Sequence, residues 1–203
     1  MKWKVLRSAV LYRLIQNIIG GTRARKIAIR RLRSVIDFAK EKSILDCGCG
    51  IGDVLSFLPD NVAYSGIDLS PRYINLAKAT WGKRGKFCIG DVCSDKNNFP
   101  KKSFDVVLFL GVLHHLNDDE ALNALSSAHE CLRENGFIYA LEPAFMPRQS
   151  LASLFFMKMD RGRYIRDIQG WKILCSKCFD LVEVDPLPNA LRIPYHKVTL
   201  FLK

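Results

Sequence analysis

The segment that most constrains this chain is Ile44 to Gly52, with the sequence ILDCGCGIG. It begins with apolar residues, continues with three glycines at alternate positions, and precedes a stretch, residues 53–58, that can open a helix. This order predicts a strand, a tight glycine turn and a helix. Glycines let the backbone turn sharply and let a ligand lie against the main chain, while the helix N-terminus faces the ligand's polar part. We therefore predict a binding site for a flat, polar ligand at this turn.

Further strands follow at the distances that a nucleotide-type site requires. Residues 64–70 form a short apolar strand that ends near Asp68, where a carboxylate can accept both hydroxyls of a ribose. Residues 86–92 repeat the design with Asp91 at the end of a third strand. Residues 103–111 are apolar almost throughout, which is typical of a strand in a sheet buried on both faces.

The chain resembles the class I S-adenosylmethionine-dependent methyltransferases in a set of motifs that occur in order: Asp46-x-Gly48-x-Gly50-x-Gly52, Asp68, Gly90-Asp91 and the strand ending at Gly111. A nicotinamide-binding Rossmann domain would instead space its glycines as G-x-G-x-x-G. The resemblance covers residues 44–203. It implies an α/β fold with a Rossmann-like, seven-stranded, mostly parallel sheet, helices on both faces, and a seventh strand inserted antiparallel beside the fifth.

The resemblance also implies S-adenosylmethionine as the cofactor and a role for each motif residue. The glycines admit the cofactor, and Asp46 orders the turn or binds the methionyl ammonium. Asp68 is expected to bind the ribose hydroxyls and Asp91 the adenine amine. The whole expected cofactor site is Asp46, Gly48, Gly50, Gly52, Asp68, Leu69, Asp91, Val92 and Gly111.

Two adjacent histidines, His114 and His115, follow the fourth predicted strand. Ligands of doubly wound sheets bind beyond the carboxyl ends of the strands, so the methyl acceptor is expected here. The cofactor supplies the electrophile, and a neutral imidazole titrates in the range needed to take a proton from a hydroxyl. We predict that one of the two histidines is this base. The alternative is that one caps the next helix or packs against the cofactor, and that catalysis is mainly by proximity.

The same Leu-His-His-Leu segment bears on the class of acceptor. By resemblance, this form is common in small-molecule methyltransferases such as those of quinone biosynthesis. Enzymes that methylate amines of nucleic acids usually carry an Asn/Asp-Pro-Pro-aromatic motif, which is missing here. That absence argues against methylation of the exocyclic amine of a base.

Charged residues near the predicted substrate wall suggest an anionic acceptor. Glu142 follows the fifth predicted strand, residues 137–141, and meets either the substrate or a structural hydrogen-bond partner. The three arginines of residues 160–166 can offer forked hydrogen bonds to a carboxylate or phosphate. The alternative is a solvated basic turn with Asp160 pairing locally. The residues predicted to bind the substrate are Glu142, Arg161, Arg163, Tyr164 and Arg166.

The first 42 residues carry most of the chain's net charge of +11, with twelve Lys and Arg against two acids. We expect helices over residues 3–19 and 23–39 and no segment long enough to cross a bilayer. Three interpretations of this arm stay open. It covers the cofactor and substrate cleft, it lies on an anionic membrane surface, or it contacts nucleic acid through phosphates, the least favoured of the three.

We therefore predict a methyltransferase domain over residues 43–203 that is preceded by a basic helical extension, residues 1–42. Seven cysteines without a disulfide-like framework fit a reduced, cytoplasmic setting, and the lone C-x-x-C at 175–178 is expected to hold free thiols rather than zinc, so no metal site is predicted. The expected reaction is methyl transfer to oxygen or carbon of a small, anionic or lipid-linked acceptor. The alternatives are an RNA methyltransferase anchored by the basic arm and a cofactor-binding partner subunit without catalysis of its own.

Overall fold

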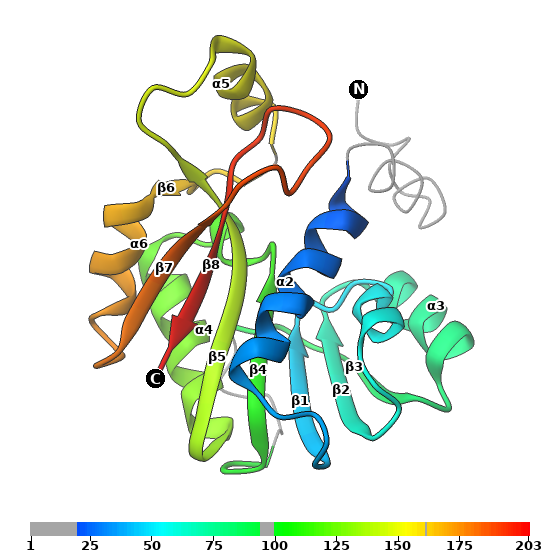
Figure 1. Cartoon of the computed structure of the whole chain (residues 1–203). Coiled ribbons are helices and arrows are strands. Elements are labelled where there is room, and N and C mark those ends of the chain that lie inside the picture. The colour runs from blue at the N-terminus through cyan, green and yellow to red at the C-terminus, as the bar shows by residue number, and fades with distance from the viewer. Residues whose placement is uncertain (1–19, 94–99, 161) are drawn as a thin grey trace.

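The computed structural model describes residues 20–93, 100–160 and 162–203. Within these ranges a central sheet is covered by helices on both faces (Figure 1). The elements are α2 (Gly21–Val35), β1 (Lys42–Cys47), the 3₁₀ helix η2 (Asp53–Phe57), β2 (Val62–Asp68), α3 (Pro71–Trp81), β3 (Gly85–Ile89), β4 (Phe104–Leu110), the 3₁₀ turn η3 (Leu113–His115), α4 (Asp118–Cys131), β5 (Leu132–Phe145), α5 (Leu151–Lys158), β6 (Arg166–Asp167), α6 (Ile168–Cys175), β7 (Val182–Leu187) and β8 (Lys197–Leu202).

The sheet has the strand order β3-β2-β1-β4-β5-β8-β7, with the short β6 paired to the end of β5. Strands β1 to β5 run parallel, and β8 is antiparallel to both β5 and β7. This confirms the predicted Rossmann-like α/β fold and the inserted antiparallel strand. The order reverses between β1 and β4, which is the place where open α/β sheets bind their ligands.

Alternate side chains of the central strands point to opposite faces of the sheet, where they belong to two hydrophobic cores. Leu45 and Val107 pack with residues of α4 and α6, whereas Ile44 and Val106 pack with residues of α2, η2 and α3. The period of two in a strand explains this division. Helix α2 therefore packs into the same core as the sheet, so the described part of the predicted N-terminal extension lies directly on the sheet.

Several predicted boundaries near the N-terminal half were wrong or fall outside the description. The helix expected over residues 3–19 lies outside the described residues. The second helix ends at Val35 rather than residue 39, because Ile36 is already extended. The segment after Gly52 forms a 3₁₀ helix of five residues instead of an α-helix.

Strand β5 is longer than the predicted residues 137–141, because it begins at Leu132, directly after α4, and ends at Phe145. Asn135 lies within it in a left-handed conformation with φ 64°. Strand β7 includes Pro186. A proline is tolerated there because β7 is an edge strand. No helix in the described parts of the chain is long and apolar enough to cross a membrane.

Candidate active site

A cavity of about 340 Å³ lies at the carboxyl ends of β1, β2 and β4. Its wall combines the glycine turn after β1 with the segments that follow β2, β3 and β4. Of the nine residues predicted for the cofactor site, all but Gly52 line it: Asp46, Gly48, Gly50, Asp68, Leu69, Asp91, Val92 and Gly111. The structure thus brings together segments that are up to 65 residues apart along the chain.

The glycine turn is held in a left-handed conformation that only glycine adopts readily. Gly48 has φ +72°, and a Cβ there would lie 2.4 Å from a methyl group of Val112. Gly50 has φ +57°, and a Cβ there would meet nothing within 4 Å. At Gly52 a Cβ would instead contact Phe87 and Trp81, so this glycine permits close packing beneath the turn and does not line the cavity, contrary to the prediction.

Asp46 is the buried acid at the head of the turn. Its Oδ2 accepts a 2.6 Å hydrogen bond from the Tyr64 hydroxyl, and its Oδ1 has no hydrogen-bond partner among the described residues. Burial raises the pKa of Asp46 to about 7, against the opposing effects of the Tyr64 hydrogen bond and the Arg25 charge. Asp46 thus lines the cavity while one of its buried carboxylate oxygens lacks a donor among the described residues.

Asp68 connects the glycine turn to the segment after β2. Its Oδ2 accepts a 2.8 Å hydrogen bond from Gly50 N, and its Oδ1 accepts one of 2.8 Å from Ser70 N. Each carboxylate oxygen keeps capacity for a second donor. The acid is therefore fixed in position at the cavity wall. Asp91 lies in the turn after β3, where its Oδ1 accepts from Cys93 N at 2.9 Å.

Arg25 on α2 also lines the cavity, and the sequence reasoning missed it. The basic arm suggested only a general positive charge. The available signal was periodicity, since Arg25 stands four and seven residues before Ile29 and Leu32, which are both buried. That spacing places Arg25 on the inward side of the helix. Its guanidinium adds a positive charge to the same cavity that Asp46 lines.

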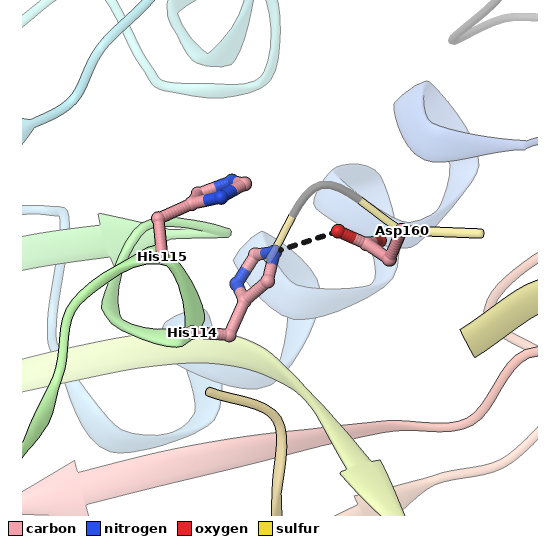
Figure 2. A group of neighbouring side chains, drawn as sticks. All are labelled: His114, His115 and Asp160. Atoms are coloured by element: carbon pink, nitrogen blue, oxygen red, sulfur yellow. Dashed lines mark ion pairs between the residues drawn. The ribbon is translucent and has the colours of Figure 1, made fainter. Parts of the chain in front are cut away.

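The two histidines of η3 have different surroundings. His114 is buried, and its Nδ1 lies 2.6 Å from Glu142 Oε2. Its Nε2 lies 3.4 Å from Asp160 Oδ1, the contact drawn as a dashed line in Figure 2. His115 is exposed and lines the cofactor cavity. His114 is therefore held inside the fold, whereas His115 is accessible at the cavity wall.

The charges around His114 favour its protonated form. Burial alone lowers the pKa of an imidazole, but the adjacent Glu142 and Asp160 carboxylates outweigh it and raise the pKa of His114 above its ordinary value. The imidazole, with Lys197 and the Val112 N–H at Glu142 and with Tyr195 and the Gly162 N–H at Asp160, outweighs the effect of burial and lowers the pKa of both acids. An imidazole that retains its proton is a poor base, so this geometry favours His115 for the proton-accepting role.

Glu142 is fully buried and does not line the cavity, so of the two roles left open for it the structure favours the structural hydrogen-bond partner over the substrate contact. Its Oε1 accepts hydrogen bonds of 2.9 Å from the backbone N–H groups of Val112 and Leu113, while its Oε2 contacts His114. One carboxylate thus fixes the whole turn that carries both histidines. Its role is to position η3.

Of the predicted anion-binding arginines, the structure describes Arg163 and Arg166. Arg161 lies outside the described residues. The Arg166 guanidinium donates to Asp118 Oδ1 at 2.6 and 3.1 Å and to the Leu116 carbonyl at 3.2 Å, so it joins three segments rather than offering a free fork to a substrate. Arg163 and Tyr164 are exposed and do not line the cofactor cavity.

His114, His115 and Asp160 bring one ligand atom each within 4.8 Å of one another, a spacing that a metal ion can use. A coordinating imidazole must give up its proton. Carboxylates lie at both ring nitrogens of His114 and favour retention of that proton. We therefore interpret the contact of His114 with Asp160 as one side of an ion pair in which the protonated His114 lies between Glu142 and Asp160.

Comparisons with known proteins agree with the geometry. Residues 44–136 match the sequence family described as "Methyltransferase domain" (Methyltransf_25). The chain is 32% identical to N-terminal Xaa-Pro-Lys N-methyltransferase 1-A of Xenopus laevis over 98 residues, 46% of this chain and 44% of that protein. It is 25% identical to Des-methyl DIF-1 methyltransferase A of Dictyostelium discoideum over 190 residues, 85% of this chain and 51% of that protein. The chain thus spans about half the length of these curated relatives.

Among solved structures, a SAM dependent methyltransferase from Archaeoglobus fulgidus superposes with a TM-score of 0.73 at 18% identity, covering 95% of this chain and 99% of that one. This likeness concerns the fold. The sequence match, in contrast, covers the glycine turn, the histidine turn, and Asp46, Asp68 and Asp91 of the cavity wall. Over residues 44–136, just under half of its length, the chain is therefore similar to the methyltransferase domain family, and its fold is that of a SAM dependent methyltransferase.

Proposed function

We propose that this protein transfers the methyl group of S-adenosylmethionine to an oxygen or carbon atom of a small, anionic or lipid-linked acceptor that enters beside His115. The observation that carries the proposal is that His115 and the glycine turn line the same cavity. A cofactor held at the turn would therefore share its cavity with the His115 imidazole.

The residues present fit S-adenosylmethionine. Asp46 Oδ1 needs a donor, which the methionyl ammonium would supply, and Arg25 brings a positive charge for the methionyl carboxylate. Open space at Gly50 allows a ligand to approach the backbone. When bound, the cofactor supplies a methyl group on a sulfonium, which is the electrophile of the reaction.

The chain's own residues would then orient the acceptor and handle its proton. Glu142 holds η3 in place, so the His115 ring stays at the cavity wall. His115 accepts the proton of the acceptor hydroxyl or acidic carbon as the methyl group moves. The chain's net charge of +11 favours an anionic acceptor. The relative with the longest aligned region described above is named for methylation of a small molecule, which supports the same acceptor class.

The test has two stages. Calorimetric titration with S-adenosylmethionine and with its demethylated product, with reduced nicotinamide cofactor as a negative control, measures the cofactor site alone. Transfer of labelled methyl groups is then assayed on anionic sugars, lipids and quinone precursors, with RNA and N-terminal Xaa-Pro-Lys peptides as competing acceptor classes. Failure to bind either methionine-derived ligand would remove the proposal, and transfer to RNA or peptide alone would replace its acceptor.

The His115→Ala variant tests the proposed base. We expect kcat to fall by about 10²-fold to 10⁴-fold while cofactor affinity changes little, because the imidazole acts on the acceptor. His129→Ala, on α4, is the matched control and should retain wild-type kcat. Full activity of His115→Ala would leave catalysis to proximity alone.

A further inference from the structure

Helix α5 exposes an unusual amount of apolar surface. Leu151, Phe155 and Met159 are 84%, 59% and 57% exposed, and they recur every four residues, which places them on one side of the helix. The opposite side carries the buried Ser153 and Met157, through which α5 packs on the protein. Contiguous exposed apolar residues of this kind usually mark an interaction surface. We call Leu151, Phe155 and Met159 the α5 apolar face.

This face lies at the end of the molecule where the cavity opens. Helix α5 follows the carboxyl end of β5 and projects from the sheet (Figure 1). Asp160 comes directly after Met159, and its Oδ1 lies 3.4 Å from His114 Nε2. His114 adjoins His115, which lines the cavity. The α5 apolar face is therefore joined to the candidate active site through one residue at the end of the helix.

Charge next to the face identifies the kind of partner. Arg148 precedes α5, Lys158 lies in its last turn, and both are exposed. The chain as a whole has a net charge of +11. Large apolar side chains bordered by cations suit a surface that combines acyl chains with anionic headgroups. A protein partner with an acidic rim would share the charge, and the experiments below distinguish it from lipid.

We propose that the α5 apolar face docks on an anionic lipid surface, and that the cavity takes its methyl acceptor from that surface as an amphiphile with a polar head. Leu151 and Phe155 enter the boundary between headgroups and acyl chains, and Arg148 and Lys158 contact the lipid phosphates. The acceptor part of this inference rests on the proposed function. The docking part does not, because it is measured without cofactor or acceptor.

Vesicle co-sedimentation of the full chain tests the docking. The probes are vesicles of phosphatidylcholine alone and of phosphatidylcholine mixed with phosphatidylglycerol. We expect strong binding to the mixed vesicles, and Phe155→Asp and Leu151→Asp should each weaken it by at least about tenfold. Ile173→Asp on α6, a residue that is 57% exposed, is the matched control and should bind as the wild type does. Unchanged binding of both α5 variants would overturn the proposal.

Two further measurements exclude other occupants of the face. A tryptophan in the Phe155→Trp variant should show a blue-shifted emission and quenching by brominated lipid when vesicles are added, relative to the wild-type protein. Thermal unfolding of Phe155→Asp should match the wild type if lipid is the partner. A clear loss of stability, or a dimer that Phe155→Asp dissociates, would show that protein covers this face and would overturn the proposal.

Discussion

The Tyr64 hydroxyl donates a 2.6 Å hydrogen bond to Asp46 Oδ2 inside the protein, while Oδ1 of the same carboxylate lacks a hydrogen-bond partner among the described residues. The two oxygens thus differ in their contacts. Oδ2 is held by Tyr64 on β2, the strand next to β1, and we expect Oδ1 to accept from a bound ligand. Burial raises the pKa of the acid to about 7, so its charge changes near neutral pH.

The first prediction is that cofactor affinity rises with pH through Asp46. A ligand ammonium binds the carboxylate form, so affinity for the demethylated cofactor should increase by about tenfold between about pH 6 and pH 8. Asp46→Asn should bind more weakly and lose this dependence. Calorimetry at several pH values measures both. An unchanged pH profile in Asp46→Asn would assign the dependence to another group.

The same shift has a defined sign for stability. The folded protein binds the Asp46 proton up to about pH 7, whereas the unfolded chain releases it near the ordinary value of 3.8. Between these values the folded state holds the extra proton, so this residue's contribution to the free energy of unfolding falls as pH rises. Asp46→Asn should show a flatter stability profile over that interval.

The second prediction concerns Arg25. Arg25→Ala should weaken binding of the demethylated cofactor by about 1.5–3 kcal/mol, through loss of a charged hydrogen bond to the methionyl carboxylate. Binding of methylthioadenosine, which lacks the amino-acid group, should be unaffected. Arg23→Ala, an exposed position on the same helix, is the control. Equal losses for both ligands would place Arg25 elsewhere in the site.

The third prediction separates two glycines of the turn. Both have positive φ, so alanine costs about 1–2 kcal/mol at either position. Gly48→Ala should cost more, because its methyl group would meet Val112, whereas Gly50→Ala has open space. Denaturant unfolding of the single variants and of Gly48→Ala/Val112→Ala measures the difference. The double variant should recover part of the loss, and additive losses would contradict the clash.

The fourth prediction concerns Glu142→Gln. Breaking a buried ion pair with His114 should reduce the free energy of unfolding by about 3 kcal/mol. The carboxylate's pKa is lowered, so its contribution is present above its ordinary value of 4.5 and is lost as pH falls through the lowered pKa. The imidazole's pKa is raised, so its contribution is complete below its ordinary value of 6.5 and is lost as pH rises through the raised pKa.

The loss in Glu142→Gln should therefore be greatest between pH 4.5 and 6.5 and become smaller at alkaline pH. Glu130→Gln, which disrupts an exposed pair with Lys101, should cost less than about 1 kcal/mol at every pH. Thermal or denaturant unfolding across this range checks both. A loss for Glu142→Gln that does not vary with pH would indicate a packing effect without an ion pair.

The cofactor side of the site was predictable because its residues follow strands in a fixed order. Each strand carries its polar residue to the same edge of the sheet, so Asp46 and Asp68 could be placed together from pattern alone. Contacts that depend on partners far along the chain were not predictable. Arg166 pairs with Asp118, 48 residues earlier, and the Tyr195 hydroxyl donates to Asp160 Oδ2 at 2.5 Å. A charge in a sequence does not specify its partner.

Glu142 is a second residue whose contacts the sequence did not predict. It lies within β5, which continues to Phe145, and the sequence left open whether its side chain meets the substrate or a structural partner. The backbone of η3 decides this by offering N–H groups to the carboxylate. Its full burial follows from that contact.

The position of β8 bears on how this domain is assembled during synthesis. Strands β1 to β4 can pair as they leave the ribosome, because each lies beside a strand made earlier or soon after. Strand β7 emerges before β8, yet it joins the sheet through β8, which lies between it and β5. Until residues 197–202 emerge, β5 therefore keeps an open edge and β7 has no place in the sheet, a state that nascent-chain binding factors would need to protect.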